Sequence, residues 1–403
     1  MTNVVGFGTL TIEEATERLI DYRGKTPPKT NSGVRLVTAK VVKGGQIHDE
    51  PAEYIAADFY DEWMRRGLPQ KLDVLLTTEA PLGEVAILRN DARIALAQRI
   101  ILLRARPGLL DPFYLFYALQ SDFGQGELKA RSSGTTVLGI KQSELRKVRI
   151  PFFPLPIQRR IAGILSAYDE LIENNQRRIK ILETMARSLY REWFVHFRFP
   201  GHESVRRVAS PLGEIPEGWE VKTLSQIAEN FDRFRKPLSK MQRAEMQGEY
   251  PYYGAAKVFD YINDFVFDGE YLLMAEDGSV INTERTPVLQ LVNEKFWPNN
   301  HTHVIRGIRS FSTHFLYLGL SEVDVSPYIT GAAQPKITQE NMNRIPFYCG
   351  PEKLHQRFNR LIEPIIRQNQ VLRRQIQNLR RSRDLLLPRL LSGQIDVEAM
   401  PHA

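Results

Sequence analysis

Two long amphipathic stretches dominate the hydrophobic pattern of the chain. In each, apolar residues recur every three or four positions, which is the spacing of one face of an α-helix. The first stretch contains Ile157, Ile161, Ile164, Tyr168, Leu171, Asn175, Ile179, Leu182, Met185, Leu189 and Trp193. The second contains Leu354, Phe358, Leu361, Ile365, Asn369, Leu372, Ile376, Leu379, Arg383, Leu386 and Leu390. The pattern predicts two long helices, each with a narrow apolar strip to bury.

Each predicted helix is the best available partner for the other, because no other segment carries a similar strip. We therefore expect an intramolecular antiparallel coiled coil. Asn175 and Asn369 interrupt the strips at corresponding places, where a buried asparagine can fix the register of the pair. A solvent-edge asparagine without that role is the alternative. Pro364 has no backbone N–H, so we expect it to kink or delay the second helix.

A similar series of segments precedes each predicted helix, and self-similarity of this kind indicates a duplicated unit. The segments are a buried strand that enters a polar turn (75–85 and 272–280), an aromatic helix (113–119 and 314–320), a small-residue turn (133–136 and 330–333) and a closing Ile-Pro pair (Ile150-Pro151 and Ile345-Pro346). The offset between the copies is about 195 residues. The pattern predicts an α/β protein with two pseudo-repeated α/β domains separated by the two helices.

The expected boundaries are 1–156 for the first domain, 157–196 for the first helix, 197–350 for a linker and the second domain, and 351–403 for the second helix and C-terminal tail. A length of 403 residues fits two domains of ordinary size. The formal charge of +7 suits a polyanionic partner, but it equally suits a protein that is merely soluble.

Cys349 is the only cysteine, so a disulfide framework and a thiolate metal site are excluded, and a cytoplasmic location is expected. Residues 1–11 lack the pattern of a secretory signal, and no apolar run reaches the roughly 18 residues of a membrane span. No contact with a membrane is therefore expected.

Three segments around the first helix are distinctive in their residue order. They are Leu155-Pro156-Ile157-Gln158-Arg159-Arg160-Ile161-Ala162-Gly163-Ile164-Leu165-Ser166-Ala167-Tyr168-Asp169, the run from Glu192 to Gly201 (EWFVHFRFPG) and the run from Gly213 to Trp219 (GEIPEGW). Residues 20–30, Tyr252-Tyr253-Gly254-Ala255 and Asp277-Gly278 extend the similarity over most of the chain. This set resembles the specificity (S) subunits of type I restriction-modification systems.

The resemblance implies two target-recognition domains, each of which binds one half of a bipartite, asymmetric site in double-stranded DNA. It implies that the helices set the spacing of the halves and dock two modification (adenine methyltransferase) subunits. Partner subunits would use S-adenosylmethionine, ATP and Mg²⁺, and motor-nuclease restriction subunits would complete the complex. The chain itself is then expected to have no catalytic site, no cofactor and no metal.

Side chains that read bases must reach the edges of the bases, so exposed loops are the candidates. In the first domain these are Arg23, Lys25 and Lys29 around a Pro-Pro turn, Thr77, Thr78 and Glu79 in the turn after the buried strand, and Arg131, Ser133, Gly134 and Thr135. In the second they are Arg233, Arg235, Lys236, Tyr252, Tyr253, Lys257, Glu276, Asp277, Asn300, His301, Gln334 and Lys336. For each of them, surface solvation or turn chemistry is the alternative.

Other functions have weaker signals. His301 and His303 could share one face of a strand, but no third ligand is evident, so a zinc site is not expected. Asp111, Glu127 and Lys129 could imitate the carboxylate-lysine pattern of a nuclease, which keeps a stand-alone DNA-cleaving enzyme as a rival. A phosphate-binding P-loop is absent. A coiled-coil adaptor that does not bind DNA is the third hypothesis.

Overall fold

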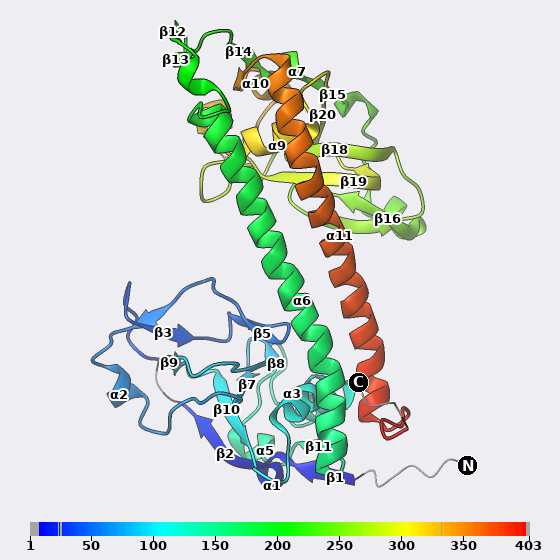
Figure 1. The fold of residues 1–403 in the computed structure, drawn as a ribbon. Helices are drawn as coiled ribbons and strands as arrows, with labels where there is room; N and C mark the ends of the chain where they lie inside the picture. The colour runs from blue at the N-terminus through cyan, green and yellow to red at the C-terminus, as the bar shows by residue number, and fades with distance from the viewer. Residues whose placement is uncertain (1–7, 23, 25, 332, 400–403) are drawn as a thin grey trace. The chain divides into compact units, whose positions relative to one another are not determined.

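The computed structural model describes residues 8–22, 24, 26–331 and 333–399 (Figure 1). It divides into two compact units. Unit 1 comprises Met1–Asn175 and Arg374–Ala403, and unit 2 comprises Gln176–Arg373. Each unit therefore combines one α/β domain with a part of both long helices.

Unit 1 is built on a four-stranded antiparallel sheet in the order β2-β10-β7-β8. Its strands are Thr16–Asp21, Ile100–Ala105, Val74–Thr78 and Leu82–Ile87. A three-stranded sheet, β6-β3-β9 (Tyr54–Ile55, Val34–Val37, Ile94–Leu96), and two strand pairs, β1-β11 (Gly8–Thr11, Arg149–Phe152) and β4-β5 (Val42–Lys43, Gln46–Ile47), complete the strands. Its shorter helices are α1 (Ile12–Ala15), α2 (Tyr60–Trp63), α3 (Pro112–Gln120), α4 (Asp122–Ala130) and α5 (Gln142–Leu145).

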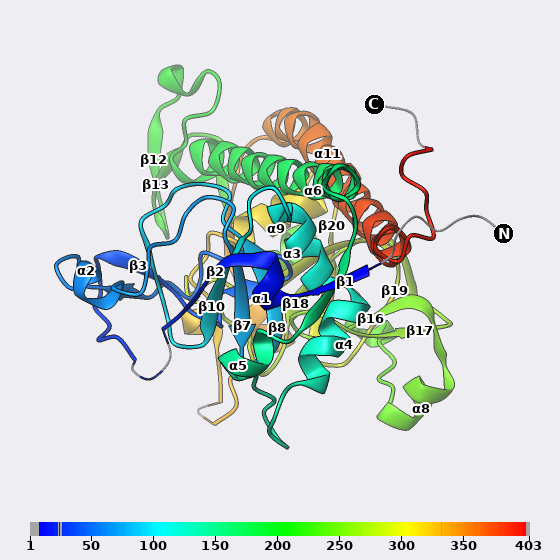
Figure 2. The ribbon, with the colours of Figure 1, turned by 90° about the horizontal axis from the view of Figure 1, so that it is seen from below.

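Helix α3 is hydrophobic on all sides because it is buried on all sides. Residues 114–119 all belong to the core, and the helix lies beside the first long helix, α6 (Figures 1 and 2). Asp111 caps its N-terminus by accepting a hydrogen bond from the Tyr114 N–H at 3.0 Å. Gln158 of α6 accepts from the Asp111 N–H at 2.9 Å and donates to the Leu109 carbonyl at 3.0 Å. The first turns of α6 thus hold α3 against the sheet.

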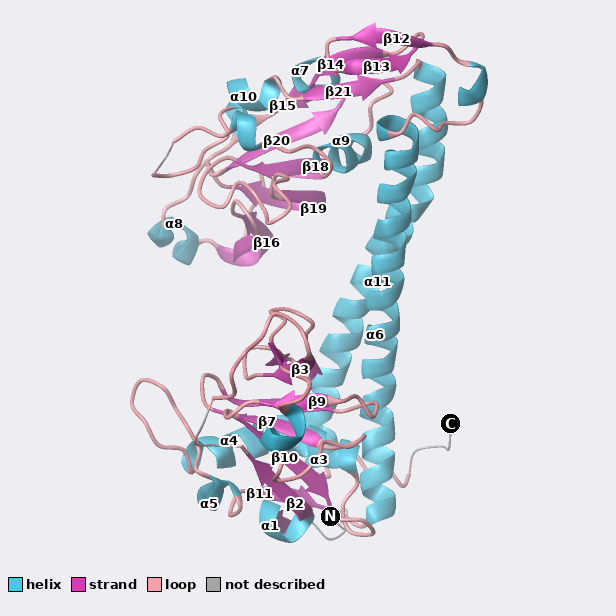
Figure 3. Ribbon diagram, turned by 90° about the vertical axis from the view of Figure 1, so that its left-hand side faces the viewer, coloured by secondary structure: helices cyan, strands magenta, loops and turns pink. Residues whose placement is uncertain are grey.

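Unit 2 repeats this plan on a six-stranded sheet in the order β15-β20-β18-β19-β16-β17 (Figure 3). Its strands are Ala228–Asn230, Thr302–Gly307, Phe267–Ala275, Leu289–Pro298, Gln247–Tyr253 and Val258–Ile262. Two further pairs are β14-β21 (Glu220–Thr223, Pro346–Cys349) and β12-β13 (Arg207–Ser210, Gly213–Pro216). The shorter helices are α7 (Leu224–Ile227), α8 (Lys240–Glu245), α9 (Thr313–Leu320) and α10 (Gln339–Asn343).

The first four strands of the unit 2 sheet follow the same order as the four strands of unit 1, so the predicted duplication of α/β domains is confirmed. The same capping box begins the first helix of each unit, with Thr11 and Glu14 in one and Thr223 and Gln226 in the other. Buried α9 takes the place of α3. Strands β16 and β17 are additions to unit 2.

The hydrogen bonds correct the sequence alignment of the two copies. The Ile12 N–H donates to the Val148 carbonyl, and the Leu224 N–H donates to the Ile345 carbonyl. Val148 and Ile345, 197 residues apart, are therefore equivalent positions. The prediction that paired the two Ile-Pro sequences was wrong by two residues, because the same dipeptide occupies different positions of the β11 and β21 strands.

The two long helices are α6 (Leu155–Tyr190), followed by a π-helical turn (Arg191–Val195), and α11 (Glu352–Leu391). The prediction that Pro364 delays α11 was wrong, because the helix begins twelve residues earlier, at Glu352, and continues through the proline. Pro364 lies on an exposed position of the helix. Among the residues that the structure describes, no helix has the length and apolar character needed to cross a membrane.

The predicted strip of the first helical stretch is right for Ile157, Ile161, Asn175, Ile179 and Trp193, which are buried, but it is wrong at other positions. Leu165, Ile172, Ile179 and Ala186 are buried at intervals of seven residues. Leu171 and Met185, which the periodicity had placed on the strip, are 53% and 51% exposed. Two apolar faces of α6 lie side by side, and a spacing of three or four residues fits both of them. In α11 the prediction is right for Phe358, Asn369, Leu372, Ile376 and Leu390, whereas Leu361 is exposed and Ile362 is buried instead.

Polar contacts connect the long helices inside each unit. In unit 1, Arg383 pairs with Asp169 at 2.6 Å, and the Asn175 amide donates to Gln375 at 3.3 Å. In unit 2, Arg373 pairs with Glu183 at 2.6 Å, and the Asn369 amide donates to Glu183 at 3.5 Å. Higher numbers on α6 meet lower numbers on α11, so the helices are antiparallel within each unit. A continuous coiled coil, and a role of Asn175 and Asn369 in its register, stay predictions.

We predict that Asp169→Ala lowers the free energy of unfolding of unit 1. The carboxylate of Asp169 accepts from the buried Tyr117 hydroxyl at 2.6 Å and pairs with Arg383, whose side chain is 24% exposed. Its removal leaves the buried Tyr117 hydroxyl and the partly buried Arg383 guanidinium without this acceptor, which costs about 2–3 kcal/mol. Urea unfolding followed by circular dichroism measures the loss. Glu183→Ala is the control, because its pair with Arg373 is exposed and such pairs contribute about 0–1 kcal/mol. Equal losses would contradict the prediction.

Candidate nucleic-acid interface

The turn after β7 exposes one of its three predicted residues. Strand β7 extends through Thr78, so Thr77 and Thr78 are 0% and 1% exposed and cannot reach a base. The expectation of an exposed turn there was wrong, because β-branched threonines extend the strand by two residues. Glu79 is half-exposed and pairs with Arg99 at 2.8 Å. Of the three predicted residues, only Glu79 is accessible to a ligand, and it is accessible together with its partner Arg99.

A closed loop lies next to this turn. Ser133 and Gly139 exchange two backbone hydrogen bonds at 2.8 and 2.9 Å, and Gly139 also forms a β-bridge with Glu79. Gly134 has φ +111°, and a Cβ there would lie 2.2 Å from the Val137 carbonyl oxygen, so the closure requires glycine. Ser133, Gly134 and Thr135 are exposed, as expected.

Unit 2 contains the same loop. Thr330 and Lys336 exchange two backbone hydrogen bonds at 2.8 Å, and Lys336 forms a β-bridge with Asp277 after β18. Gly331 has φ +85°, and a Cβ there would lie 2.4 Å from the Gln334 carbonyl oxygen. Gly331 follows Gly134 by 197 residues, the same offset as in the core. Each unit thus presents one glycine-closed loop beside the end of the corresponding strand.

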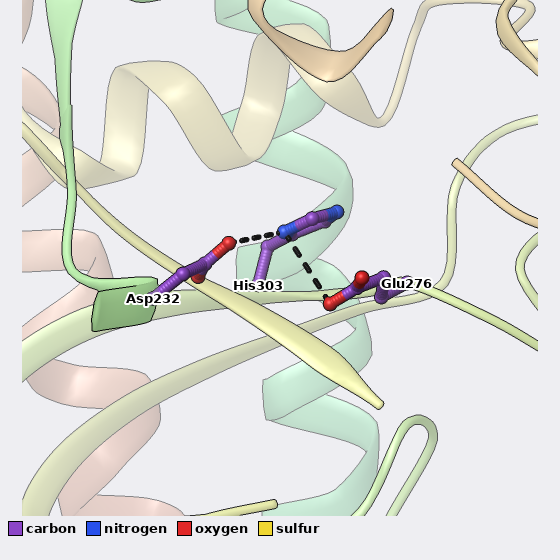
Figure 4. Close-up of side chains that lie close together, drawn as sticks. All are labelled: Asp232, Glu276 and His303. Carbon is purple, nitrogen blue, oxygen red and sulfur yellow. Dashed lines mark hydrogen bonds and ion pairs between the residues drawn. The ribbon is translucent and has the colours of Figure 1, made fainter. Parts of the chain in front are cut away.

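An ion-pair network anchors the unit 2 loop (Figure 4). His303 is buried, and its Nδ1 lies 2.5 Å from an Asp232 oxygen and 3.8 Å from Glu276. Its Nε2 donates to the Ile337 carbonyl at 2.8 Å. Arg235 contacts Glu276 at 2.6 Å and Asp232 at 3.5 Å. The network fixes the end of the loop to the sheet.

Sequence reasoning missed this network, because it paired His303 with His301. The structure separates the two histidines. The exposed His301 pairs with Asp277 at 2.7 Å, whereas the buried His303 faces Asp232. Potential ligand atoms of Asp232, Glu276 and His303 lie within 4.8 Å of one another, which is close enough to share a metal ion. Arg235 and Lys336 already compensate these carboxylates, Lys336 at 3.0 Å from Glu276, so an ion pair is the simpler chemistry.

The surroundings lower the pKa values of both carboxyl groups. Burial by itself would raise the pKa of Asp232, but the hydrogen bond and charge of His303, with the charge of Arg235, outweigh it. Burial likewise opposes the lowered pKa of Glu276, which results from contacts with Arg235, His303 and Lys336. Both groups are therefore held as carboxylates.

Several predicted residues do not lie where the sequence had placed them. Tyr252 and Tyr253 belong to strand β16 rather than to a loop, and Tyr252 is 2% exposed. The Tyr253 hydroxyl donates to Glu294 at 2.7 Å. Arg235 is taken up by the network, and Arg131 pairs with Glu127 at 3.4 Å. Tyrosines are common in strands as well as in binding loops, so the composition of this segment did not show whether it is a strand or a loop.

The remaining candidates are accessible at the surface. Lys29 is exposed and pairs with Glu53 at 2.9 Å. Arg23 and Lys25 lie outside the described residues. The exposed candidates of unit 2 are Arg233, Lys236, Lys257, Asn300, His301 and Gln334, with Asp277 and Lys336 partly exposed.

Both carboxylates of the nuclease hypothesis have a structural role. Asp111 is the N-cap of α3. Glu127 pairs with Arg149 at 3.0 Å and with Arg131, and these contacts lower the pKa of its carboxyl group. Lys129 is exposed on α4. Within the described ranges, the group that could share a metal ion contains neither Asp111 nor Glu127.

Comparisons with known proteins agree with this architecture. The family model described as "Type I restriction modification DNA specificity domain" matches residues 64–184 and 216–381. The type I restriction enzyme MjaIX specificity subunit of Methanocaldococcus jannaschii is 28% identical over 350 residues, which are 81% of this chain and 78% of that protein. The type I restriction enzyme EcoprrI specificity subunit of Escherichia coli is 19% identical over 79% of this chain and 71% of its own length.

A crystal structure of the S subunit of a type I restriction-modification system from M. genitalium matches 97% of both chains with a TM-score of 0.62 and 17% identity, which establishes a shared fold. The two matches of the family model cover most of the chain. The chain belongs to the type I restriction-modification specificity subunit family, and its two α/β domains are target-recognition domains of that family.

We predict that unit 2 loses stability in acid through Asp232 and Glu276. Their pKa values are lower in the folded chain than in the unfolded chain, where they are about 3.9 and 4.3. The stability they contribute is therefore complete above about pH 5 and is lost as the pH falls through the folded pKa values. Glu276→Gln should lower the Tm at pH 7, and the difference from wild type should shrink towards pH 3. Thermal unfolding at several pH values measures this, with the exposed Glu229→Gln as control. A difference that is independent of pH would contradict the prediction.

Proposed function

We propose that each target-recognition domain of this chain binds one half of a bipartite, asymmetric DNA site. The observation that carries the proposal is the duplicated loop, because both copies are closed by the same pair of backbone hydrogen bonds and by a positive-φ glycine but present different side chains. At equivalent positions, unit 1 has Val137 and Gly139 where unit 2 has Gln334 and Lys336. The same loop closure favours similar docking on a duplex, and different side chains favour different bases. The two half-sites should therefore differ in sequence.

Exposed cations accompany these loops. Arg233, Lys236 and Lys257 carry positive charge in unit 2, and Lys29 carries it in unit 1. Cations of this kind bind phosphates and position a protein on DNA without reading its sequence. The chain would thus separate two tasks, with cations that supply affinity and loop side chains that select bases.

The bond-making chemistry belongs, in this proposal, to partner subunits. Modification subunits dock on the long helices and methylate adenines with S-adenosylmethionine, and restriction subunits use ATP and Mg²⁺. The helices determine the gap between the half-sites. The membership in the specificity subunit family and the structural roles of Asp111 and Glu127 support this division of labour.

Reconstitution tests the proposal. The purified chain should transfer no methyl group by itself, whereas the chain with modification subunits should methylate adenines in one split sequence, which sequencing of modified bases can map. Replacement of residues 330–336 with a loop from a relative should change one half of that sequence. Insertion of one heptad in α6 should change the gap and neither half.

Three outcomes would overturn the proposal. One is methyl transfer by the chain alone. Another is magnesium-dependent cleavage by the chain alone that Glu127→Ala abolishes, as the nuclease hypothesis predicts. The third is a loop replacement that alters both halves of the site.

We further predict that Lys236→Ala and Lys257→Ala weaken DNA binding uniformly across sequences. Each lost phosphate contact should reduce the slope of log affinity against log salt by about 0.9. Fluorescence anisotropy titrations at several salt concentrations, from about 50 to about 200 mM, measure the affinity for DNA and therefore the slope. Lys353→Ala is the control, because this exposed lysine lies at the start of α11, away from the loops. An unchanged slope would mean that these lysines do not contact phosphates.

A further inference from the structure

Unit 1 contains a cavity of about 230 Å³ next to the candidate interface. Apolar side chains, among them Leu36 and Ala97, form much of its wall, and Lys29, Lys40 and Arg99 supply three cations. Ligand pockets for whole small molecules commonly measure about 300–1,000 Å³. The volume therefore suits a single planar ring rather than a complete nucleotide.

Within the part of the chain that the structure describes, two polar atoms of the cavity lining have no hydrogen-bond partner. They are Oγ1 of Thr38, a residue that is 9% exposed, and Oε2 of Glu53, whose side chain is 15% exposed. The other carboxylate oxygen of Glu53 pairs with Lys29 at 2.9 Å and with Lys40 at 3.4 Å. Buried polar atoms are nearly always bonded in folded proteins, so two such atoms in one cavity point to an occupant.

The charge state of Glu53 restricts that occupant. Burial raises the pKa of this carboxyl group, but Lys29 and Lys40 more than offset the effect, and the net pKa is lowered. Glu53 is therefore a carboxylate, which only accepts hydrogen bonds. The occupant must donate an N–H, and a keto oxygen facing Glu53 would be repelled. Thr38 can either donate or accept.

The position of the cavity connects it with the loops described above. Ala80 and Arg99 line it, Arg99 pairs with Glu79, and Glu79 forms a β-bridge with Gly139 of the glycine loop. Lys29, itself an expected DNA contact, is another lining residue. A duplex held by the loops would bring bases and phosphates to this cavity.

We propose that this cavity receives an amine-bearing base (cytosine, adenine or guanine) that is displaced from the bound duplex, with the carboxylate of Glu53 accepting from the exocyclic amine of the base. A base that stays stacked in the duplex exposes only its edge in a groove. The unpartnered oxygen of Glu53 lies buried inside the domain, so a base must leave the stack to reach it. Carboxylates select amine-bearing bases, and cations along the lining suit the phosphates on either side. The inference rests on the proposed function, since it assumes that unit 1 binds DNA.

Duplexes with the mapped sequence test this inference, each with an abasic site opposite one position of the first half-site. Displacement costs least when a base has no partner, so at one cytosine, adenine or guanine the abasic duplex should bind the full chain about tenfold more tightly than the paired duplex. Glu53→Gln should abolish this gain and shift the preference there towards thymine, which has no exocyclic amine, because the glutamine amide can donate to a keto oxygen. Thr38→Val, which conserves shape, should weaken the gain. The exposed Glu13→Gln, which loses a pair with Arg146, should leave it unchanged.

The outcomes separate the two proposals. If the chain with its modification subunits recognises no split sequence, the proposed function fails. If it recognises one but no abasic position strengthens binding, or if the gain persists in Glu53→Gln, the base-binding cavity is refuted while the proposed function stands. Melting temperatures of the variants identify loss of folding, and in that case Thr38→Val decides, since an undiminished gain in this variant also refutes the cavity.

Discussion

The need to bury one apolar strip on each long helix governs the structure. Within each unit the two helices lie against one another and against a short helix that is hydrophobic on all sides, α3 or α9, which in turn covers the central sheet. Leu165 and Ile161 of α6 therefore share a core with α3, while Tyr190 and Phe358 share one with α9. Neither domain can be completed without both helices, which explains why each compact unit includes a part of each.

Each unit carries, on its own core, a loop that is closed by the same pair of backbone hydrogen bonds. Gly134 and Gly331 close loops that no residue with a side chain would close in the same way. Ser133, Thr135, Val137 and Gln334 are exposed, and their side chains take no part in the backbone bonds that close the loops. A protein that selects DNA sequences benefits from such a separation, since readout can change while the scaffold is retained.

The acidic groups near these loops differ between the units. Glu276 in unit 2 is bonded to Arg235 and Lys336, and the network around His303 is satisfied within the domain. Among the described residues, Glu53 in unit 1 has lysine partners for one carboxylate oxygen and none for the other. The first arrangement stabilises a loop, and the second leaves an acceptor for a ligand. The role of each glutamate thus depends on whether cations bind both of its carboxylate oxygens, as in Glu276, or only one of them, as in Glu53.

The sequence by itself determined the duplication, the two long helices, the glycine loops and the family, because these depend on periodicity, spacing and local residue order. It did not determine which of two adjacent apolar faces of α6 is buried, that Thr77, Thr78 and Tyr252 lie inside strands, or that His303 pairs with Asp232 rather than with His301. The tertiary structure decided these points. Each depends on contacts between segments that are far apart in the chain, and a local pattern contains no information about the partner across the fold.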